Sequence, residues 1–181
     1  VVPEEKKVYL AFNKPRGIVC TAEKREKNNV IDYLSYPVRI YPVGRLDKDS
    51  EGLLLMTNDG AIVNGIMRAR NRHEKEYQVE VNKEITPEFL KKMASGVPIL
   101  DTVTRPCRIR KTGERSFTII LTQGLNRQIR RMCEALGYRV TKLKRVRIMN
   151  VHLKDLKTGE YRPLTEKELA ELKKQIGEEK R

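Results

Sequence analysis

The segment at residues 43–60, VGRLDKDSEGLLLMTNDG, holds four acids whose types and spacing could support chemistry. They are Asp47, Asp49, Glu51 and Asp59. Acids in such a segment can ligate calcium, shape a turn, or provide a catalytic carboxylate. Asp47 is the acid of most interest, because it follows Gly-Arg-Leu and precedes a leucine run that predicts a buried strand. Each of the three roles requires different neighbours.

The spacing of the acids does not fit a calcium-binding loop. Asp47, Asp49, Glu51 and Gly52 fit positions 1, 3, 5 and 6 of an EF-hand-like loop, but position 12 is Asn58, where a bidentate carboxylate is required. The residues before Asp47 are also typical of a strand rather than a helix. A turn acid remains a full alternative for Asp47 from the local pattern alone, because Asp and Gly are common turn residues. Asp49, Glu51 and Asp59 are interpreted as turn and cap residues.

The charge of the chain indicates a polyanionic partner. The 181 residues include 38 Lys and Arg against 24 Asp and Glu, a formal net charge of +14. Residues 126–147 concentrate this charge against the single acid Glu134. The basic residues there are Arg127, Arg130, Arg131, Arg139, Lys142, Lys144, Arg145 and Arg147. Nucleic acid is therefore the favoured partner, although few aromatic residues argue against a binder that works mainly by stacking on bases.

Other function classes are disfavoured by what the sequence contains. Cys20, Cys107 and Cys133 form no CxxC pair and there are two histidines, so we expect buried free thiols and no metal site. No apolar run reaches the roughly 20 residues of a membrane helix, so no membrane partner is expected. We expect a cytoplasmic monomer that needs no cofactor.

Periodicity and boundary residues predict an α+β fold. The expected helices cover 30–34, 58–69, 86–96, 124–137 and 164–177. The expected strands cover 8–12, 18–20, 38–47, 53–57, 74–81, 105–110 and 116–121, with one or two more in 138–153. In the fourth helix, Ile129, Met132, Cys133 and Leu136 share one face, and Arg130 lies at the edge of that face. Thr165 and Glu168 form a predicted capping box for the last helix.

Three motifs occur together in a fixed order. They are GRLDKDSEGLLLMTNDG at 44–60, HEKEYQV at 73–79, and TQGLNRQIRRMCEALGYRVTKLKRVRIMN at 122–150, with NKPRGIV at 13–19 before them. This set closely resembles the RsuA-like family of ribosomal RNA pseudouridine synthases, which includes the RluB, RluE and RluF types, and is most similar to the RluF type. The resemblance runs from about residue 8 to residue 172.

The resemblance implies a mixed, largely antiparallel sheet in two lobes flanked by helices, with an active-site cleft across the sheet. It implies a single catalytic domain at 1–181. Relatives usually carry an S4-like RNA-binding domain before the catalytic domain, and we expect that domain to be absent here. The implied activity is isomerisation of a uridine in 23S ribosomal RNA. A synthase acting on 16S rRNA or tRNA, or a catalytically silent RNA-binding or ribosome-assembly factor on the same scaffold, is the alternative.

The resemblance also assigns roles to residues. Asp47 is the implied catalytic carboxylate, Arg130 its ion-pair partner, and Tyr77 the active-site tyrosine that stacks on the uracil. Lys75 shares the Tyr77 motif and the same strand face. Arg45 is placed to fill the position of a flipped-out base. The remaining candidates are expected to contact phosphates: Arg127, Arg131, Lys142, Lys144, Arg145 and Arg147.

Overall fold

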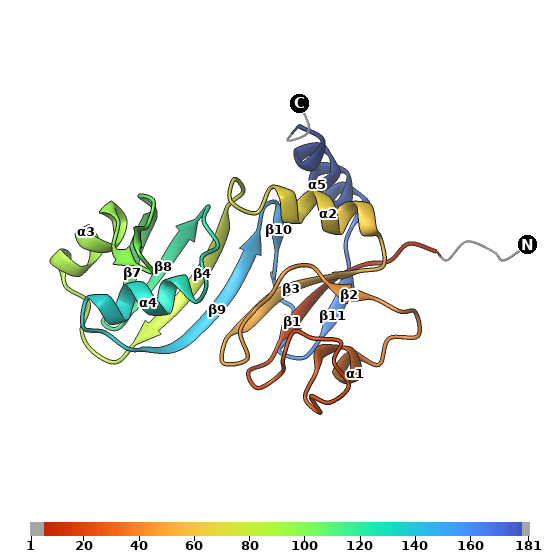
Figure 1. The fold of residues 1–181 in the computed structure, drawn as a ribbon, viewed down its shortest axis with the longest axis horizontal. Coiled ribbons are helices and arrows are strands. Elements are labelled where there is room, and N and C mark those ends of the chain that lie inside the picture. Colours follow the sequence, from red (N-terminus) through yellow and green to blue (C-terminus); the bar gives the residue numbers. More distant parts are fainter. Residues whose placement is uncertain (1–5, 179–181) are drawn as a thin grey trace, which may run out of the picture. The chain divides into compact units, whose positions relative to one another are not determined.

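The computed structural model describes residues 6–178, so the extreme ends of the predicted 1–181 domain lie outside the described residues. The chain divides into two compact units (Figure 1). Unit 1 combines Val1–Ala69 with Asn150–Arg181, and unit 2 is Arg70–Met149. Asp47 belongs to unit 1, whereas Tyr77, Arg130 and the predicted phosphate contacts at 127–147 belong to unit 2.

Unit 1 is built around antiparallel strands. Its elements are β1 (Tyr9–Lys14), α1 (Val30–Leu34), β2 (Tyr41–Pro42), β3 (Glu51–Thr57), α2 (Gly60–Arg68), β10 (Val151–His152), β11 (Tyr161–Pro163) and α5 (Glu166–Glu178). Strand β1 lies between β11 and β3, and β2 pairs with β3. All residues of β3 after Glu51 are buried, as expected for a strand covered on both faces.

The helices of unit 1 begin and end where their sequences predict. Asp59 is the N-cap of α2, because its side chain accepts a hydrogen bond from the N–H of Ala61 (3.1 Å). Helix α2 packs on α5 at Gly65, where a Cβ would collide with the side chain of Ile176. The capping box of α5 is confirmed: Glu168 N–H donates to Thr165 Oγ1 (3.0 Å), and Thr165 N–H donates to Glu168 Oε1 (2.9 Å).

Unit 2 is an antiparallel sheet with two helices. Its elements are β4 (Lys75–Val81), α3 (Pro87–Ser95), β5 (Pro98–Ile99), β6 (Thr102–Val103), β7 (Arg108–Gly113), β8 (Ser116–Leu121), α4 (Gln128–Ala135) and β9 (Val140–Ile148). The strand order within the unit is β9-β4-β8-β7. Strands β5 and β6 form a separate small hairpin.

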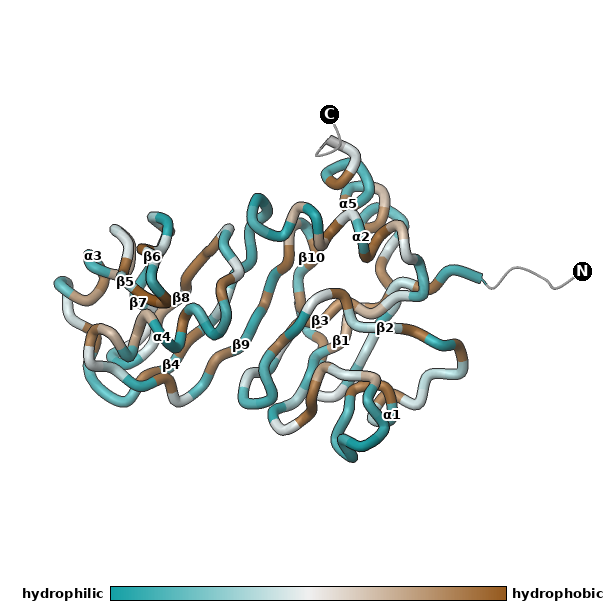
Figure 2. The backbone as a smooth tube through the Cα atoms, in the orientation of Figure 1, coloured by the Kyte–Doolittle hydropathy of each residue, from teal (hydrophilic) through white to brown (hydrophobic). Residues whose placement is uncertain are grey.

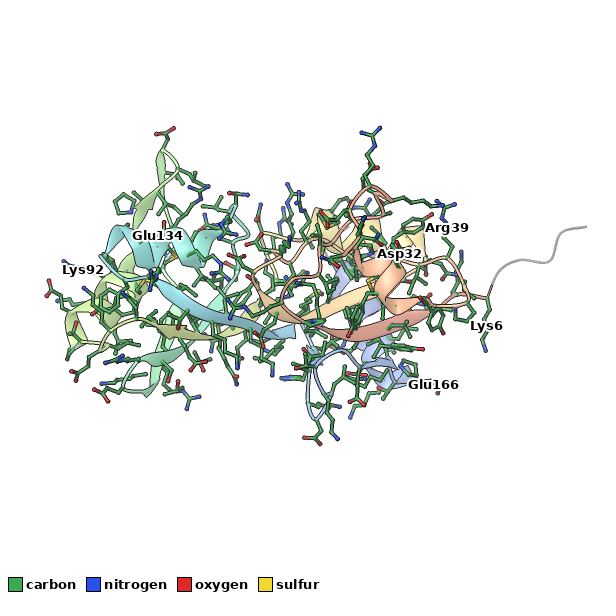
Figure 3. All side chains as sticks on the ribbon, turned by 90° about the horizontal axis from the view of Figure 1, so that it is seen from below. Lys6, Asp32, Arg39, Lys92, Glu134 and Glu166 are labelled. Atoms are coloured by element: carbon green, nitrogen blue, oxygen red, sulfur yellow. The ribbon has the colours of Figure 1, made fainter. Side chains whose placement is uncertain are left out.

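One face of the unit 2 sheet carries the core. Alternate residues of β4, β8 and β9, such as Val79, Phe117, Ile119 and Leu143, are buried on this face. Figure 2 shows the alternation as hydrophilic and hydrophobic segments along β9. Helices α3 and α4, marked by Lys92 and Glu134 in Figure 3, supply the rest of this core. Their contributions are Phe89, Met93, Ile129, Met132 and Cys133. The opposite face of the sheet is therefore polar.

The predicted α+β class with largely antiparallel strands is confirmed, and so are the five predicted helices. Two strand predictions are wrong. Residues 18–20 make only an isolated bridge, between Val19 and Asn29, and the strand expected at 38–47 is limited to β2. Glu51 begins β3 and is not a turn residue. The three cysteines are free, as predicted, but only Cys133 is buried. Among residues 6–178, no helix is long and apolar enough to cross a membrane.

Candidate active site

Asp47 lies in a loop whose backbone is fixed on both sides within unit 1. The N–H of Ser50 donates to the carbonyl of Asp47 (3.0 Å), which closes a tight turn. The neighbouring carbonyls of Leu46 and Lys48 accept hydrogen bonds from the Cys20 thiol (3.2 Å) and the Gly17 N–H (2.8 Å). The loop at 43–50 is thus tied to Gly17 of the NKPRG segment and to Cys20 just after it, so two motifs distant in sequence are adjacent in unit 1.

The loop leaves β2 before it reaches Asp47. Gly44 has φ of +76°, a conformation that glycine adopts without strain and that turns the chain out of the strand direction. The Leu46 side chain is buried in the core beside Leu54 and Met56 of β3. Asp47 itself is partly buried, and Arg45 is exposed. Leu46, which is buried and directly precedes Asp47, therefore anchors the predicted catalytic carboxylate.

Lys14 is a fully buried lysine at the end of β1, and its burial was not predicted from the sequence. Its ammonium donates to the carbonyls of Pro15 (2.9 Å) and Ile18 (2.7 Å), so it holds the turn that contacts the Asp47 loop. Burial lowers the pKa of Lys14, and the nearby acid Asp47 acts in the opposite direction. Lys14 therefore contributes both a structural link and a positive charge near the loop.

Tyr77 and Lys75 lie on β4 of unit 2, on the face that carries the core. Tyr77 is partly buried, packs against the core, and is directly opposite Arg145 on β9. Arg145 is 7% exposed, which is unusual for an arginine. The predicted phosphate contact at Arg145 is thus a cross-strand neighbour of the predicted uracil-stacking tyrosine.

Lys75 has a strongly perturbed ammonium. Its Nζ donates to the carbonyls of Arg70 and Thr122. Burial, followed by the positive charges of Arg145, Arg105 and Arg70, lowers the pKa of Lys75 to about 8. The Lys75 ammonium is therefore bound to backbone carbonyls of unit 2. The RNA contact predicted for Lys75 remains a prediction.

Helix α4 positions Arg130 as the periodicity predicts. Ile129, Met132 and Cys133 are buried in the core, and Arg130 next to them is 8% exposed. The helix begins after Arg127, which has φ of +49° and an exposed side chain. The ion pair predicted between Arg130 and Asp47 of unit 1 remains a prediction.

The first turn of α4 is stabilised by polar contacts that the sequence did not reveal. Buried Gln128 accepts a hydrogen bond from the Leu125 N–H (3.1 Å). Arg131 donates to the carbonyl and to the side chain of Asn126, both at 2.9 Å. The predicted phosphate contact Arg131 thus also stabilises the helix start.

The basic run at 139–147 does not form one surface. Lys142 and Lys144 lie on the polar face of the sheet, opposite the face with Tyr77 and Arg145. An irregularity in the pairing of β4 and β9, next to Tyr77, puts Arg147 on the polar face as well. This division depends on the strand register and could not be read from the spacing of the charges.

Arg147 is largely occupied by acids. Its guanidinium forms ion pairs with Glu74 (3.0 Å) and Glu76 (3.2 Å) and donates to the carbonyl of Met149 (2.9 Å). Lys142 lies 4.0 Å from a carboxylate oxygen of Glu80. The phosphate contacts predicted for Arg147 and Lys142 would compete with these partners, and both remain predictions.

Comparison with known proteins gives these motifs a family. A sequence profile described as RNA pseudouridylate synthase matches residues 8–135, which include Asp47, Tyr77 and Arg130. The chain belongs to the RNA pseudouridylate synthase family. Membership of this family confirms the resemblance drawn from the sequence motifs, whereas the roles of individual residues are not assigned by it.

Several relatives of this family are similar over nearly the whole chain. The dual-specificity RNA pseudouridine synthase RluF of Escherichia coli K12 is 55% identical over 169 residues, which are 93% of this chain and 58% of RluF. The ribosomal large subunit pseudouridine synthase B of Bacillus subtilis is 36% identical over 180 residues, 95% of this chain and 74% of that protein. The chain therefore spans less than two thirds of the length of its RluF relatives.

The fold agrees with the family. A crystal structure of a pseudouridylate synthase matches this chain with a TM-score of 0.85 and 30% sequence identity, over 93% of this chain and 75% of that one. The predicted pseudouridine synthase fold is thus confirmed.

Proposed function

We propose that this chain is the catalytic part of an RNA pseudouridine synthase that isomerises a uridine of ribosomal RNA, with 23S rRNA as its first target. The family match across residues 8–135 is the observation that carries this proposal. It is supported by the relatives, whose names describe RNA pseudouridine synthases, including one of the ribosomal large subunit. We further propose that it acts as a cytoplasmic monomer.

The reaction is an isomerisation, so atoms and electrons balance within the substrate. The N1–C1′ glycosidic bond of uridine breaks, and a C5–C1′ bond forms after the uracil has turned. The proton on C5 is lost and N1 gains one. The protein must provide a carboxylate beside the ribose, a group that removes the C5 proton, and a pocket that retains the detached base.

Asp47 takes the role of the carboxylate in this proposal. Its loop is held by the Gly17 N–H and by buried Leu46, which fits a carboxylate that must be positioned accurately, whether it attacks C1′, adds to the base or removes the C2′ proton. Arg130 takes the role of the cation that keeps Asp47 ionised. Tyr77 stacks on the uracil, and Arg45 fills the space of the flipped-out nucleotide.

The proposal is tested by incubating the protein with unmodified transcripts and mapping pseudouridine chemically. Transcripts of 23S rRNA, 16S rRNA and tRNA are separate arms, because the RluF relatives are named dual-specificity enzymes and the target class is open. We expect a product at defined uridines of the 23S transcript. Pseudouridine formed only in the 16S rRNA or tRNA transcript would change the proposed substrate but would still support the proposed activity.

The role of Asp47 has its own test. We expect Asp47→Asn to lower the single-turnover rate by about 10⁴ or more, because the amide cannot act as a nucleophile or base. Affinity for the transcript should change little. Asp49→Asn is the matched control, two residues away in the same loop, and should retain activity. An active Asp47→Asn variant would refute the assignment.

The alternative function is a catalytically silent RNA-binding or ribosome-assembly factor. It predicts that the wild-type protein binds the transcripts and forms no pseudouridine in any arm. The same two measurements, binding and product, therefore separate the two hypotheses.

A further inference from the structure

The polar face of the unit 2 sheet is organised in cross-strand rungs. The strand register places four residues side by side in each rung, in the order β9, β4, β8, β7. The first rung is Arg147, Glu76, Ile120 and Arg108; the middle rung is Lys144, Gln78, Thr118 and Arg110; the third rung is Lys142, Glu80, Ser116 and Gly113. None of these positions takes part in the predicted isomerisation chemistry.

The acids of this face lie beside the outer rungs. In the first rung, Glu74 joins Arg108 (2.6 Å) to Arg147 (3.0 Å), and Glu76 also pairs with Arg147. In the third rung, Lys142 lies 4.0 Å from Glu80. The cations of both outer rungs therefore have acidic partners within the unit.

The middle rung contains no acid. Lys144 and Arg110 stand at its two ends, and within residues 6–178 neither side chain makes a hydrogen bond or ion pair. Between them lie the amide of Gln78 and the hydroxyl of Thr118, which can both donate hydrogen bonds. Gln78 and Arg110 are exposed, and Lys144 and Thr118 are partly exposed. The rung therefore presents two cations and two neutral donors to solvent.

A depression in the surface lies over the middle and third rungs. A shallow depression of about 300 Å³ is bordered by Gln78, Thr118 and Lys144 of the middle rung and by Ser116, Glu80 and Lys142 of the third rung. Ser116 adds another hydroxyl. Lys144 lines this depression and Arg110 does not, and the acid in the lining, Glu80, lies 4.0 Å from Lys142. A phosphate backbone that runs along the middle rung can contact both Lys144 and Arg110.

We propose that the middle rung is a binding site for the phosphate backbone of the RNA substrate, on the sheet face opposite Tyr77. Three strand spacings separate β9 from β7, roughly 14 Å, so the site spans a length of backbone rather than a single small anion. Residues 70–149, all of them described, place no aromatic side chain in the three rungs, so the site holds RNA without reading bases. The inference rests on the proposed function only in taking RNA as the ligand.

The test compares two double variants of the full chain in binding to an oligouridylate and to unmodified 23S transcript. Arg110→Gln with Lys144→Gln removes both charges of the middle rung. Arg108→Gln with Lys92→Gln is the matched control, because it removes one arginine and one lysine of the same unit that already pair with the acids Glu74 and Glu88. Both variants lose two positive charges.

We expect the middle-rung variant to weaken binding about tenfold or more at 0.1 M salt and to reduce the slope of log K against log salt by about 1.4. The control should change the Kd less than threefold. Equal losses in both variants would show a general effect of net charge, and no loss in the middle-rung variant would remove the site; either result overturns the inference.

The outcome is separable from that of the proposed function. Binding is measured on unmodified RNA and does not depend on turnover. A wild-type protein that forms no pseudouridine yet shows the expected difference between the two variants would refute the activity and support the site.

Discussion

Lys14 is a buried charge beside the loop that carries the predicted catalytic Asp47. Its ammonium bonds the carbonyls of Pro15 and Ile18 and lies near the Asp47 loop. The charge is desolvated, which is costly, and the cost is offset only where hydrogen bonds and nearby acids favour the charged form. We infer that Lys14 is a positioning residue for the loop.

Replacing this lysine should therefore affect both stability and rate. We expect Lys14→Met to lower the free energy of unfolding by about 1–3 kcal/mol, because the partly buried carbonyls of Pro15 and Ile18 lose their donor. It should also slow single-turnover pseudouridine formation, because the turn that holds the Asp47 loop is loosened. Urea unfolding and single-turnover kinetics measure the two effects.

The control for Lys14 is Lys48→Met, in the same loop as Asp47. Lys48 is exposed, and its backbone carbonyl, rather than its side chain, accepts the Gly17 N–H. This variant should match the wild type in both assays. A Lys14→Met variant as stable and as fast as the wild type would show that the ammonium is dispensable.

At the level of elements, the helices were predictable because their signals are local. Thr86 caps α3 and accepts from the Phe89 N–H (3.1 Å), as its place before Pro87 indicates. The wrong strand at 38–47 has a tertiary cause: Gly44 and the tie between Lys48 and Gly17 bend the chain out of the sheet. The hairpin of β5 and β6 has two residues per strand, too few for a pattern.

The division of the basic residues between sheet faces was not predictable for a different reason. Alternation along β9 is clear in the sequence, but the irregularity that redirects Arg147 depends on its pairing with β4. Arg110 of the middle rung lies outside the basic run at 126–147, and only the register brings it into line with Lys144. Motifs predicted Asp47, Tyr77 and Arg130 as candidates, whereas the strand register was needed to place Arg147, Arg110 and Lys144 on the polar face.

The capping box of α5 gives a prediction about pH. The Arg162 guanidinium pairs with the Glu168 carboxylate at 2.7 Å. This guanidinium and the Thr165 N–H lower the pKa of Glu168 to about 2. Because this pKa is below the ordinary value, the stabilisation is present above about pH 4.5 and is lost as the pH falls towards 2. We expect Glu168→Gln to lower the free energy of unfolding by about 1–3 kcal/mol at neutral pH.

The difference between Glu168→Gln and the wild type should shrink as urea unfolding is repeated at lower pH. Glu171→Gln, on the same helix with an exposed side chain that only accepts from Gln175 (3.3 Å), is the control and should show a small difference at every pH. A constant difference for Glu168→Gln down to pH 3 would contradict the assigned ion pair.

On the scale of the whole chain, the net charge of +14 attracts RNA, and the number of phosphates that the basic residues neutralise determines how binding depends on salt. The phosphate contacts proposed without an acidic partner in an ion pair number about five. They are Arg127, Arg131, Arg145, and the middle-rung residues Lys144 and Arg110. Neutralising five phosphates of a single strand releases counterions with a log–log slope of about −3.5, so affinity should fall about 130-fold between 50 and 200 mM salt.

Fluorescence anisotropy with a labelled oligouridylate measures this slope. A probe of the same bases on an uncharged backbone is the control and should show weak binding with little salt dependence, because it has no counterions to release. A flat salt response with the normal oligouridylate would contradict these phosphate contacts together. A steep response whose slope falls by about 1.4 in the middle-rung variant would assign two of those contacts to Lys144 and Arg110.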